Sequence, residues 1–348
     1  MKKLFKDPAL QTQFEHDGVL QLRILRDAQI SELLEFYHSL GLEDDKGFGF
    51  YVSMDKQDKA LVRRVVDEIY RVVLPATEFV FSNAKVFTAS FVIKDPNPKG
   101  VVPIHQDWTF VDKEGEYNSI TAWIALVDMN IDIGTLGAIK GSHTYFKHTR
   151  PSPSPQASTP LANQQFSLFP YLQTMDIKAG EAIIFDNRTF HASPPNTTDK
   201  LRVAVGLGFT QLEAQLCHYY LKPDGNKNRL LKYKVDEDFF IKYDNARLSA
   251  MYEQGETIED YELTEEVEYR LPVFSNEQIL DMVKGSGNIM NLPLIEKLAI
   301  IFNYNPNGSK KEEIEKNHTL NHVPVKKPFW QVYTPINILR EIKYRLTN

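Results

Sequence analysis

Three residues in this sequence have the types and spacing of a mononuclear metal site. His105 and Asp107 lie two positions apart, and His191 follows much later in the chain. Because residues two apart on an extended backbone point to the same side, His105 and Asp107 can hold one ion together. Two imidazoles and one carboxylate on one face of an ion leave about three positions open, which is typical of Fe(II) oxygenases. A bare His-x-Asp with a distant histidine is a weak pattern, and each histidine could instead be an ordinary core residue.

The segment 201–209 adds a candidate carboxylate receptor. It reads LRVAVGLGF, with apolar residues on one face and Arg202 among small residues on the other. A guanidinium beside small residues in a barrel wall suits a carboxylate, because its fork matches two oxygens at once. Ser193 shares the parity of His191 and can donate a further hydrogen bond. The alternative for Arg202 is an exposed salt bridge at a sheet edge, which the otherwise apolar strand disfavours.

The elements that must position these residues read as helices followed by short strands. Segments 30–37 and 59–74 carry apolar residues at helical spacing, and the second should end at Pro75. Four later segments are rich in β-branched and aromatic residues and are separated by turns: 85–94, 119–127, 182–185 and 201–209. This pattern predicts an antiparallel sandwich or barrel rather than an alternating βα fold.

The segments between and after these strands are less regular. Residues 150–160 (RPSPSPQASTP) are too rich in proline and serine for central sheet or helix, and they read either as a lid or as a passive linker. Beyond residue 209 the alternation fades. Ser275 begins a capping box for a helix, and residues 303–317 read as a solvated loop.

Composition narrows the class of protein. The chain has 348 residues, 42% hydrophobic and 25% charged, as in an ordinary globular enzyme. Its net charge of −6 argues against nucleic-acid binding, and no apolar run is long enough to span a membrane. Cys217 is the single cysteine, which excludes an intramolecular disulfide and a thiolate cluster. The N-terminus lacks the apolar stretch of a secretory signal, so we expect a cytoplasmic protein.

The motifs together resemble the phytanoyl-CoA dioxygenase-like family of Fe(II)/2-oxoglutarate-dependent oxygenases. The resemblance spans about residues 10–210. It comprises a strand ending in Lys94, then His105-Gln106-Asp107, Thr121-Ala122-Trp123-Ile124-Ala125-Leu126, a glycine-rich turn closing with Gly141-Ser142-His143, His191-Ala192-Ser193, and Arg202. His143 is expected to be structural.

The resemblance implies a mainly β fold with flanking helices and a double-stranded β-helix (jelly roll, cupin-like) core. We expect residues 1–83 to form an N-terminal helical flank that packs on the core. Residues 84–210 should form the catalytic core with a lid at 144–175. Residues 211–348 should form a helical or irregular C-terminal extension, either part of the same domain or a cap.

The resemblance also implies the ligands and the site. Fe(II) would be held by His105, Asp107 and His191, with O2 and 2-oxoglutarate as co-substrates. Candidate contacts to 2-oxoglutarate are Arg202, Ser193, Lys94, Thr121 and Trp123. A basic group in the predicted lid, Lys147, His148 and Arg150, favours an anionic group on the substrate.

The predicted activity is hydroxylation of an unactivated C–H bond in a small organic substrate, with release of succinate and CO2. The alternatives are a non-catalytic cupin-like binding or regulatory protein, and a desaturase or cyclase that uses the same oxidant. A small-molecule substrate is the only partner that the sequence indicates. Its identity, and the choice between hydroxylation and desaturation, are not encoded in a recognisable motif.

Overall fold

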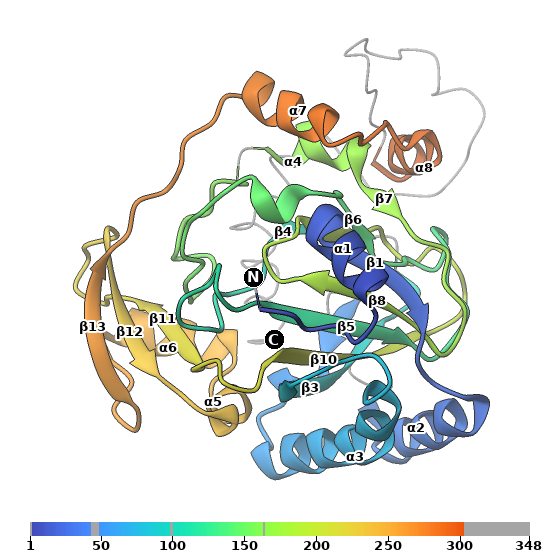
Figure 1. Ribbon diagram of the computed structural model, residues 1–348, viewed down its shortest axis with the longest axis horizontal. Helices are drawn as coiled ribbons and strands as arrows, with labels where there is room; N and C mark the ends of the chain where they lie inside the picture. Colours follow the sequence, from blue (N-terminus) through green and yellow to red (C-terminus); the bar gives the residue numbers. More distant parts are fainter. Residues whose placement is uncertain (1, 43–48, 98–99, 163, 303–348) are drawn as a thin grey trace, which may run out of the picture.

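The structure is a computed structural model, and it describes residues 2–42, 49–97, 100–162 and 164–302. Two antiparallel sheets form its centre, and helices flank them (Figure 1). The six-stranded sheet has the spatial order β1 (Val19–Arg23), β8 (Glu181–Asp186), β5 (Ser119–Ala125), β10 (Arg202–Gln211), β3 (Ala84–Lys94) and β2 (Phe50–Val52). The four-stranded sheet has the order β4 (Val102–His105), β9 (His191–Ser193), β6 (Gly137–Ala138) and β7 (Gln173–Thr174).

The way the chain alternates between these sheets defines the fold. Strands β3, β5, β8 and β10 belong to the larger sheet, whereas β4, β6, β7 and β9 belong to the smaller one. Neighbouring strands run antiparallel throughout. The chain therefore winds as a double-stranded β-helix, which is a jelly roll of the cupin type. The predicted fold class is confirmed.

The N-terminal flank packs on the larger sheet and also extends it. Its helices are α1 (Pro8–Asp17), α2 (Asp27–Ser39), the short η2 (Ser53–Asp55) and α3 (Lys59–Thr77). Leu33 of α2 and Ile69 of α3 are buried in one apolar cluster with Phe91 of β3. Because β1 and β2 are the edge strands of the larger sheet, the flank is continuous with the core and is not purely helical.

Helix α3 extends beyond its predicted end. Pro75 lies inside the helix, which ends at Thr77. A proline in the last turn removes one backbone hydrogen bond, and the amide of Glu78 still donates to Leu74 O (3.3 Å). The predicted end at Pro75 is therefore wrong.

The region after residue 210 contains a second small sheet that the sequence did not predict. Its strands are β11 (Cys217–Leu221), β12 (Arg229–Lys234) and β13 (Glu262–Glu268), and its helices are α5 (Glu237–Lys242), α6 (Asn245–Gln254), α7 (Asn276–Gly285) and α8 (Leu292–Phe302). Strand β13 reads ELTEEVE. Because glutamate is depleted in strands, this sequence resembles that of a helix or loop. It pairs with the basic strand β12, where Arg229 Nε lies 2.7 Å from Glu266. The expectation that the C-terminal extension is helical or irregular is therefore wrong for these three strands. Residues 303–348, including the predicted loop 303–317, lie outside the described residues.

The proline-rich part of the predicted lid is packed against this C-terminal region. Short helices η3 (Ser142–Thr144), α4 (Gln165–Leu168) and η4 (Phe169–Tyr171) lie within or beside the segment. The amide of Ser154 donates to Asn245 Oδ1 (2.8 Å), and the hydroxyl of Tyr269 donates to Ser158 O (2.6 Å). These bonds fix the segment in place in this structure, and its role as a lid stays a prediction.

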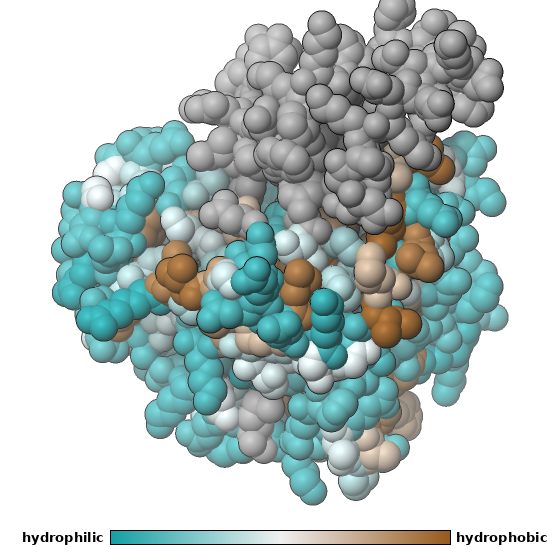
Figure 2. All heavy atoms as spheres, turned by 90° about the horizontal axis from the view of Figure 1, so that it is seen from above, coloured by the Kyte–Doolittle hydropathy of each residue, from teal (hydrophilic) through white to brown (hydrophobic). Residues whose placement is uncertain are grey.

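Helices α7 and α8 lie over the smaller sheet and α4 (Figure 1). The predicted capping box at Ser275 is present at the start of α7. Seen from this side, hydrophobic side chains are interspersed among hydrophilic ones (Figure 2), and the exposed large ones around these helices include Val273, Ile289, Met290, Leu292 and Ile300. Among the described residues no helix combines the length and apolarity that a membrane crossing requires.

Candidate metal centre

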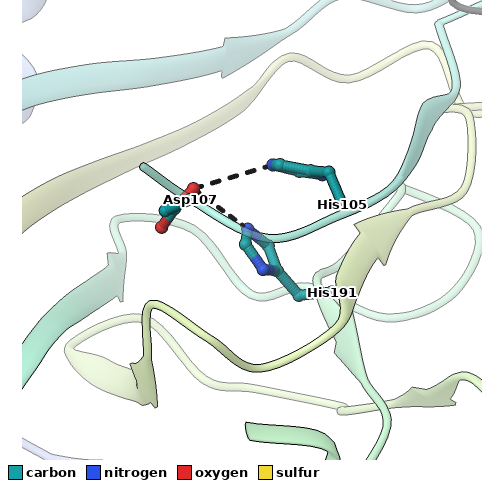
Figure 3. Close-up of side chains that lie close together, drawn as sticks. All are labelled: His105, Asp107 and His191. Atoms are coloured by element: carbon teal, nitrogen blue, oxygen red, sulfur yellow. Dashed lines mark ion pairs between the residues drawn. The ribbon is translucent and has the colours of Figure 1, made fainter. Parts of the chain in front are cut away.

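The smaller sheet brings the three predicted metal ligands together. His105 ends β4 and His191 begins β9, and the two residues are paired across the sheet. Asp107 follows two residues after His105, and its Oδ1 lies 3.8 Å from His105 Nε2 and 3.6 Å from His191 Nε2 (Figure 3). One ligand atom from each side chain can be chosen so that all lie within 4.8 Å of one another. Strand pairing therefore assembles in space what the sequence separates.

Both histidines are oriented by hydrogen bonds to backbone carbonyls. His105 Nδ1 lies 2.8 Å from Pro103 O, and His191 Nδ1 lies 3.0 Å from Thr189 O. A carbonyl oxygen can only accept, so each Nδ1 carries a proton, and Nε2 of the neutral imidazole then has a lone pair for a metal. Burial, and then the neighbouring His105, lower the pKa of His191 to about 4. The imidazole of His191 is therefore neutral at physiological pH, as a metal ligand must be.

The carboxylate of Asp107 is held by its other oxygen. Asn187 Nδ2 donates to Asp107 Oδ2 at 2.7 Å, and the hydroxyl of Thr121 lies 3.4 Å from the same oxygen. The amide of Asp107 in turn donates to Asn187 O (2.9 Å). Asn187 was not predicted from the sequence. The available signal was a polar residue directly after the buried strand β8 and shortly before His191.

The arrangement fits a bound divalent cation. Two imidazole nitrogens and one carboxylate oxygen converge, and in the neutral form of both rings no proton lies between these atoms. Such an arrangement is repulsive unless a cation lies at its centre. The side chains of His105, Asp107 and His191 are 40%, 24% and 7% exposed, so the site is accessible from the side of His105. Two nitrogens and one oxygen with an open side are the donor set of non-haem Fe(II).

Arg202 is buried without an ionic partner. Its side chain is 1% exposed, and Nη1 donates to Gly134 O at 2.7 Å. Its Nε is buried with no hydrogen-bond partner, and no carboxylate of the described residues forms an ion pair with it. The guanidinium lies over the ring of Trp123, 5.2 Å from its centroid. Burial lowers the pKa of Arg202 to about 9.

Lys94 lies beside Arg202, because the two residues are paired between β3 and β10. Its Nζ donates to Ser193 Oγ (2.5 Å) and Pro194 O (2.6 Å). Burial, and then the charge of Arg202, hold the pKa of Lys94 well below its usual range. Gly134 permits this packing, since a Cβ there would lie 2.6 Å from Pro194 O. Among the described residues neither of these two adjacent basic side chains has an acidic partner, so a bound anion would stabilise their charged forms.

The other two predicted co-substrate contacts have different surroundings. Trp123 packs its ring against Arg202 and thus acts on the guanidinium. The hydroxyl of Thr121 accepts a hydrogen bond from Asn187 Nδ2 (2.7 Å) and lies beside Asp107. Thr121 therefore supports a metal ligand, and its predicted contact with 2-oxoglutarate has no support in this geometry.

The basic group predicted in the lid does not form a free anion receptor. Every N–H of Arg150 is used: Nε donates to Asp107 O, Nη1 to Glu114 and His148 O, and Nη2 to Glu114 and Trp108 O. Burial, and then Arg150, lower the pKa of His148 to about 3, so this imidazole is neutral. Lys147 is exposed. The expected basic cluster is therefore corrected, because a partly buried acid, Glu114, neutralises the charge of Arg150.

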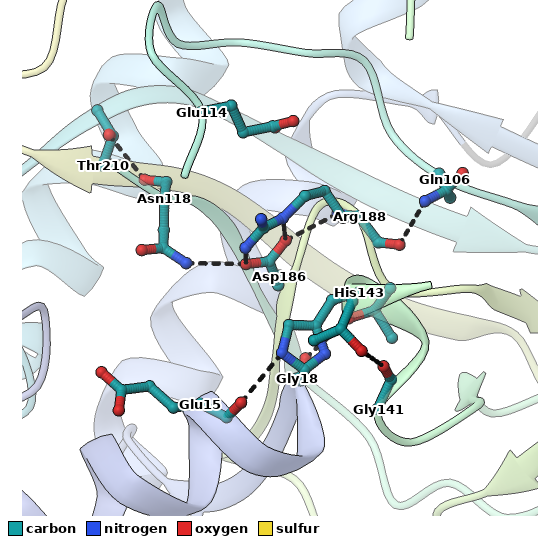
Figure 4. Close-up of polar contacts among 12 residues, drawn as sticks. Glu15, Gly18, Gln106, Glu114, Asn118, Gly141, His143, Asp186, Arg188 and Thr210 are labelled. Atoms are coloured by element: carbon teal, nitrogen blue, oxygen red, sulfur yellow. Dashed lines mark hydrogen bonds and ion pairs between the residues drawn. The ribbon is translucent and has the colours of Figure 1, made fainter. Parts of the chain in front are cut away.

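His143 has the structural role that we expected. Its Nε2 lies 3.2 Å from Glu15 O (Figure 4), and its ring packs on Gly18. Gly18 has a positive φ of 69°, and a Cβ there would lie 2.3 Å from His143 Nδ1. A glycine is therefore required where α1 ends and β1 begins.

The strand order and the converging His-Asp-His side chains define a jelly-roll protein with a candidate mononuclear metal site. Residues 43–204 match the family model described as phytanoyl-CoA dioxygenase (PhyH). The resemblance found in the sequence is confirmed. The matched family and the donor set of the candidate site are those of non-haem oxygenases that depend on iron and 2-oxoglutarate.

Individual relatives are distant. Phytanoyl-CoA dioxygenase domain-containing protein 1 of Danio rerio is 26% identical over 209 residues, which are 55% of this chain and 72% of that protein. Its Dictyostelium discoideum homolog is 27% identical over 149 residues, 41% of this chain and 48% of that protein. Among solved structures, the non-heme alpha ketoglutarate dependent carbocyclase SnoK from nogalamycin biosynthesis is 19% identical, with a TM-score of 0.43 over 60% of this chain and 86% of that chain. The fold assignment therefore rests on the strand order of this chain.

Proposed function

We propose that the protein hydroxylates an unactivated C–H bond of a small organic substrate. In this reaction one atom of O2 enters the new hydroxyl group and the other enters succinate, while 2-oxoglutarate loses its C1 carboxylate as CO2. The observation that carries the proposal is the convergence of His105 Nε2, Asp107 Oδ1 and His191 Nε2 on one point with an open side.

The proposed ligands are these three side chains, and Fe(II), when bound, supplies the redox chemistry that activates O2. The residues contribute orientation and charge. Their hydrogen bonds to Pro103 O and Thr189 O keep the histidine Nε2 lone pairs directed to the metal. The carboxylate of Asp107 would compensate part of the charge of a bound metal.

The proposed anchor for 2-oxoglutarate is Arg202. A guanidinium with an unused Nε–H can receive a carboxylate through two parallel hydrogen bonds. Lys94, when protonated, places a second positive charge beside it. The hydroxyl of Ser193, which accepts from Lys94, keeps its own proton free to donate to the ligand. Trp123 keeps the guanidinium in place and shields it from water.

The prime substrate is proposed to be a small organic molecule that enters from the side of His105. An anionic group on it was expected from Lys147, His148 and Arg150. Of these, Arg150 is neutralised by Glu114 and His148 is uncharged, so Lys147 is the remaining candidate for such a contact.

The test is turnover of 2-oxoglutarate labelled at its C1 carboxylate by the full-length protein loaded anaerobically with Fe(II) and then exposed to air. Labelled CO2 should be released, and His191→Ala should release none. A non-catalytic binding protein would bind 2-oxoglutarate and release no label. With a metabolite extract and isotopic O2, a hydroxylase transfers the isotope to the product, whereas a desaturase or cyclase does not.

A further inference from the structure

We propose that Asn187 is a positioning residue that keeps the Asp107 carboxylate bound to the metal through one oxygen only. The inference rests on the proposed function, because it takes Asp107 as a metal ligand. It concerns the number of open positions at the metal, which decides whether co-substrate and O2 can both bind.

Asn187 contacts Asp107 at two points. Its Nδ2 donates to Asp107 Oδ2 at 2.7 Å, and its carbonyl accepts the amide N–H of Asp107 at 2.9 Å. The same Nδ2 donates to the Thr121 hydroxyl, which lies 3.4 Å from Asp107 Oδ2. The oxygen Oδ2 is thereby engaged with donors, and Oδ1 is the oxygen that faces the two histidines.

Asn187 is itself held rigidly. It is 0% exposed, and its backbone amide donates to Ser119 O of β5 at 3.1 Å. A carboxylate that lost the Nδ2 contact could rotate and place both oxygens toward a cation. A second bond to the metal would then occupy a position that the co-substrate or O2 requires.

The energetic cost of burying the side-chain amide of Asn187 supports a specific role for this residue. Asn187 Oδ1 is buried and accepts no hydrogen bond from the described residues. A buried acceptor without a donor destabilises a fold, so an asparagine is a poor choice for packing alone. The contacts that it does make are those of Nδ2, and both lead to the metal ligand.

Asn118 is a matched control. It is also a buried amide, 4% exposed, and its Nδ2 donates to the carboxylate of Asp186 at 2.9 Å (Figure 4). Asp186 forms a bidentate ion pair with Arg188 and does not contact the three candidate ligands. Asn118 therefore repeats the chemistry of Asn187 next to a carboxylate that binds no metal.

The experiment compares Asn187→Ala and Asn187→Asp with Asn118→Ala and Asn118→Asp, with Co(II) as the probe. Affinity is measured by competition with a chelator, and coordination by the positions and intensities of the visible d–d bands. Loss of the partner of a metal ligand typically weakens metal binding by about 10- to 100-fold. We expect this loss, with shifted bands, in both Asn187 variants. Both Asn118 variants should keep the wild-type affinity within about twofold and the wild-type bands, even where their melting temperature falls.

A further variant tests the proposal if the Asn187 variants do not fold. Thr121→Val removes the hydroxyl that is the other contact of Asp107 Oδ2 besides Asn187 Nδ2. This variant should shift the same bands in the same direction by a smaller amount. Unchanged affinity and bands in folded Asn187→Asp, or an equal loss in Asn118→Ala, would overturn the role of Asn187. If Asn187→Ala and Asn187→Asp do not fold, unchanged bands in Thr121→Val would overturn it. Failure of the wild-type protein to bind Co(II) would instead overturn the proposed function.

Discussion

Arg150 and Arg202 are both buried arginines near the candidate metal centre, yet their surroundings are opposite. Arg150 has a carboxylate partner in Glu114 and uses all of its N–H groups. Arg202 has one hydrogen bond, to Gly134 O, and no acidic partner among the described residues. A buried charge without a partner is costly, so a chain keeps one where a ligand completes it. The comparison distinguishes an arginine that supports the backbone around the candidate site from one that we propose binds a ligand.

The largest expected effect is the loss of folding stability in Arg150→Ala. The change removes the ion-pair partner of Glu114, which is 15% exposed, and the Arg150 donors of three backbone carbonyls. Breaking a buried ion pair in this way costs about 3–5 kcal/mol. We therefore expect a lower free energy of unfolding, measured with urea, and weaker metal binding, because Arg150 Nε holds the backbone of Asp107. Wild-type stability in this variant would contradict the structural role of Arg150.

Arg202→Ala should give the reverse pattern. Binding of 2-oxoglutarate should weaken by about 2–4 kcal/mol, since a charge-assisted bidentate contact in a buried site is lost. Stability of the ligand-free protein should be unchanged or higher, because the variant removes an uncompensated buried charge. Calorimetric titration and urea unfolding measure the two quantities. Arg202→Lys should recover part of the affinity only, as an ammonium lacks the fork. Loss of stability without loss of 2-oxoglutarate affinity would show that Arg202 is the structural arginine.

The difference between the two arginines marks the limit of prediction from the sequence. The sequence predicts which face of its strand carries Arg202, and that His105 and Asp107 lie close together, because both depend on local backbone geometry. Glu114 is distant from Arg150 in the sequence, and only tertiary packing pairs them. The basic composition of the lid therefore predicts a free receptor, whereas the structure pairs Arg150 with Glu114. Strand β13 was missed for the same reason, since its glutamates are explained by a basic partner strand.

A smaller loss of stability is expected at acidic pH from His218, which contacts Ser152, two residues after Arg150. His218 is fully buried, its Nε2 lies 2.7 Å from the hydroxyl of Ser152, and burial lowers its pKa to about 3. Its pKa in the unfolded state is near 6.5, so the unfolded state binds more protons between these two values. Stability should therefore be complete above about pH 6.5 and should fall as the pH drops toward 3, by roughly 1–2 kcal/mol from this group by pH 5.

The variant that tests this origin is His218→Gln, which removes the titrating group. Urea unfolding at several pH values should give a shallower fall than in the wild-type protein, even if the variant is less stable at pH 7. An equally steep fall would assign the acid sensitivity to other groups, such as His148, whose pKa is also lowered to about 3.

The smallest effect is expected where Trp123 supports Arg202. The indole lies 5.2 Å from the guanidinium and is 4% exposed, so the contact is shielded from water. A cation–π contact of this kind contributes about 0.5–2 kcal/mol, and indole is the strongest of the aromatic rings. Trp123→Phe should therefore weaken 2-oxoglutarate binding by a few-fold, and Trp123→Leu by more, while metal affinity remains unchanged. The same substitutions in an Arg202→Ala background should have little further effect on 2-oxoglutarate binding, because the cation that the ring supports is gone. An equal loss in both backgrounds would mean that Trp123 acts on the ligand or on packing independently of Arg202.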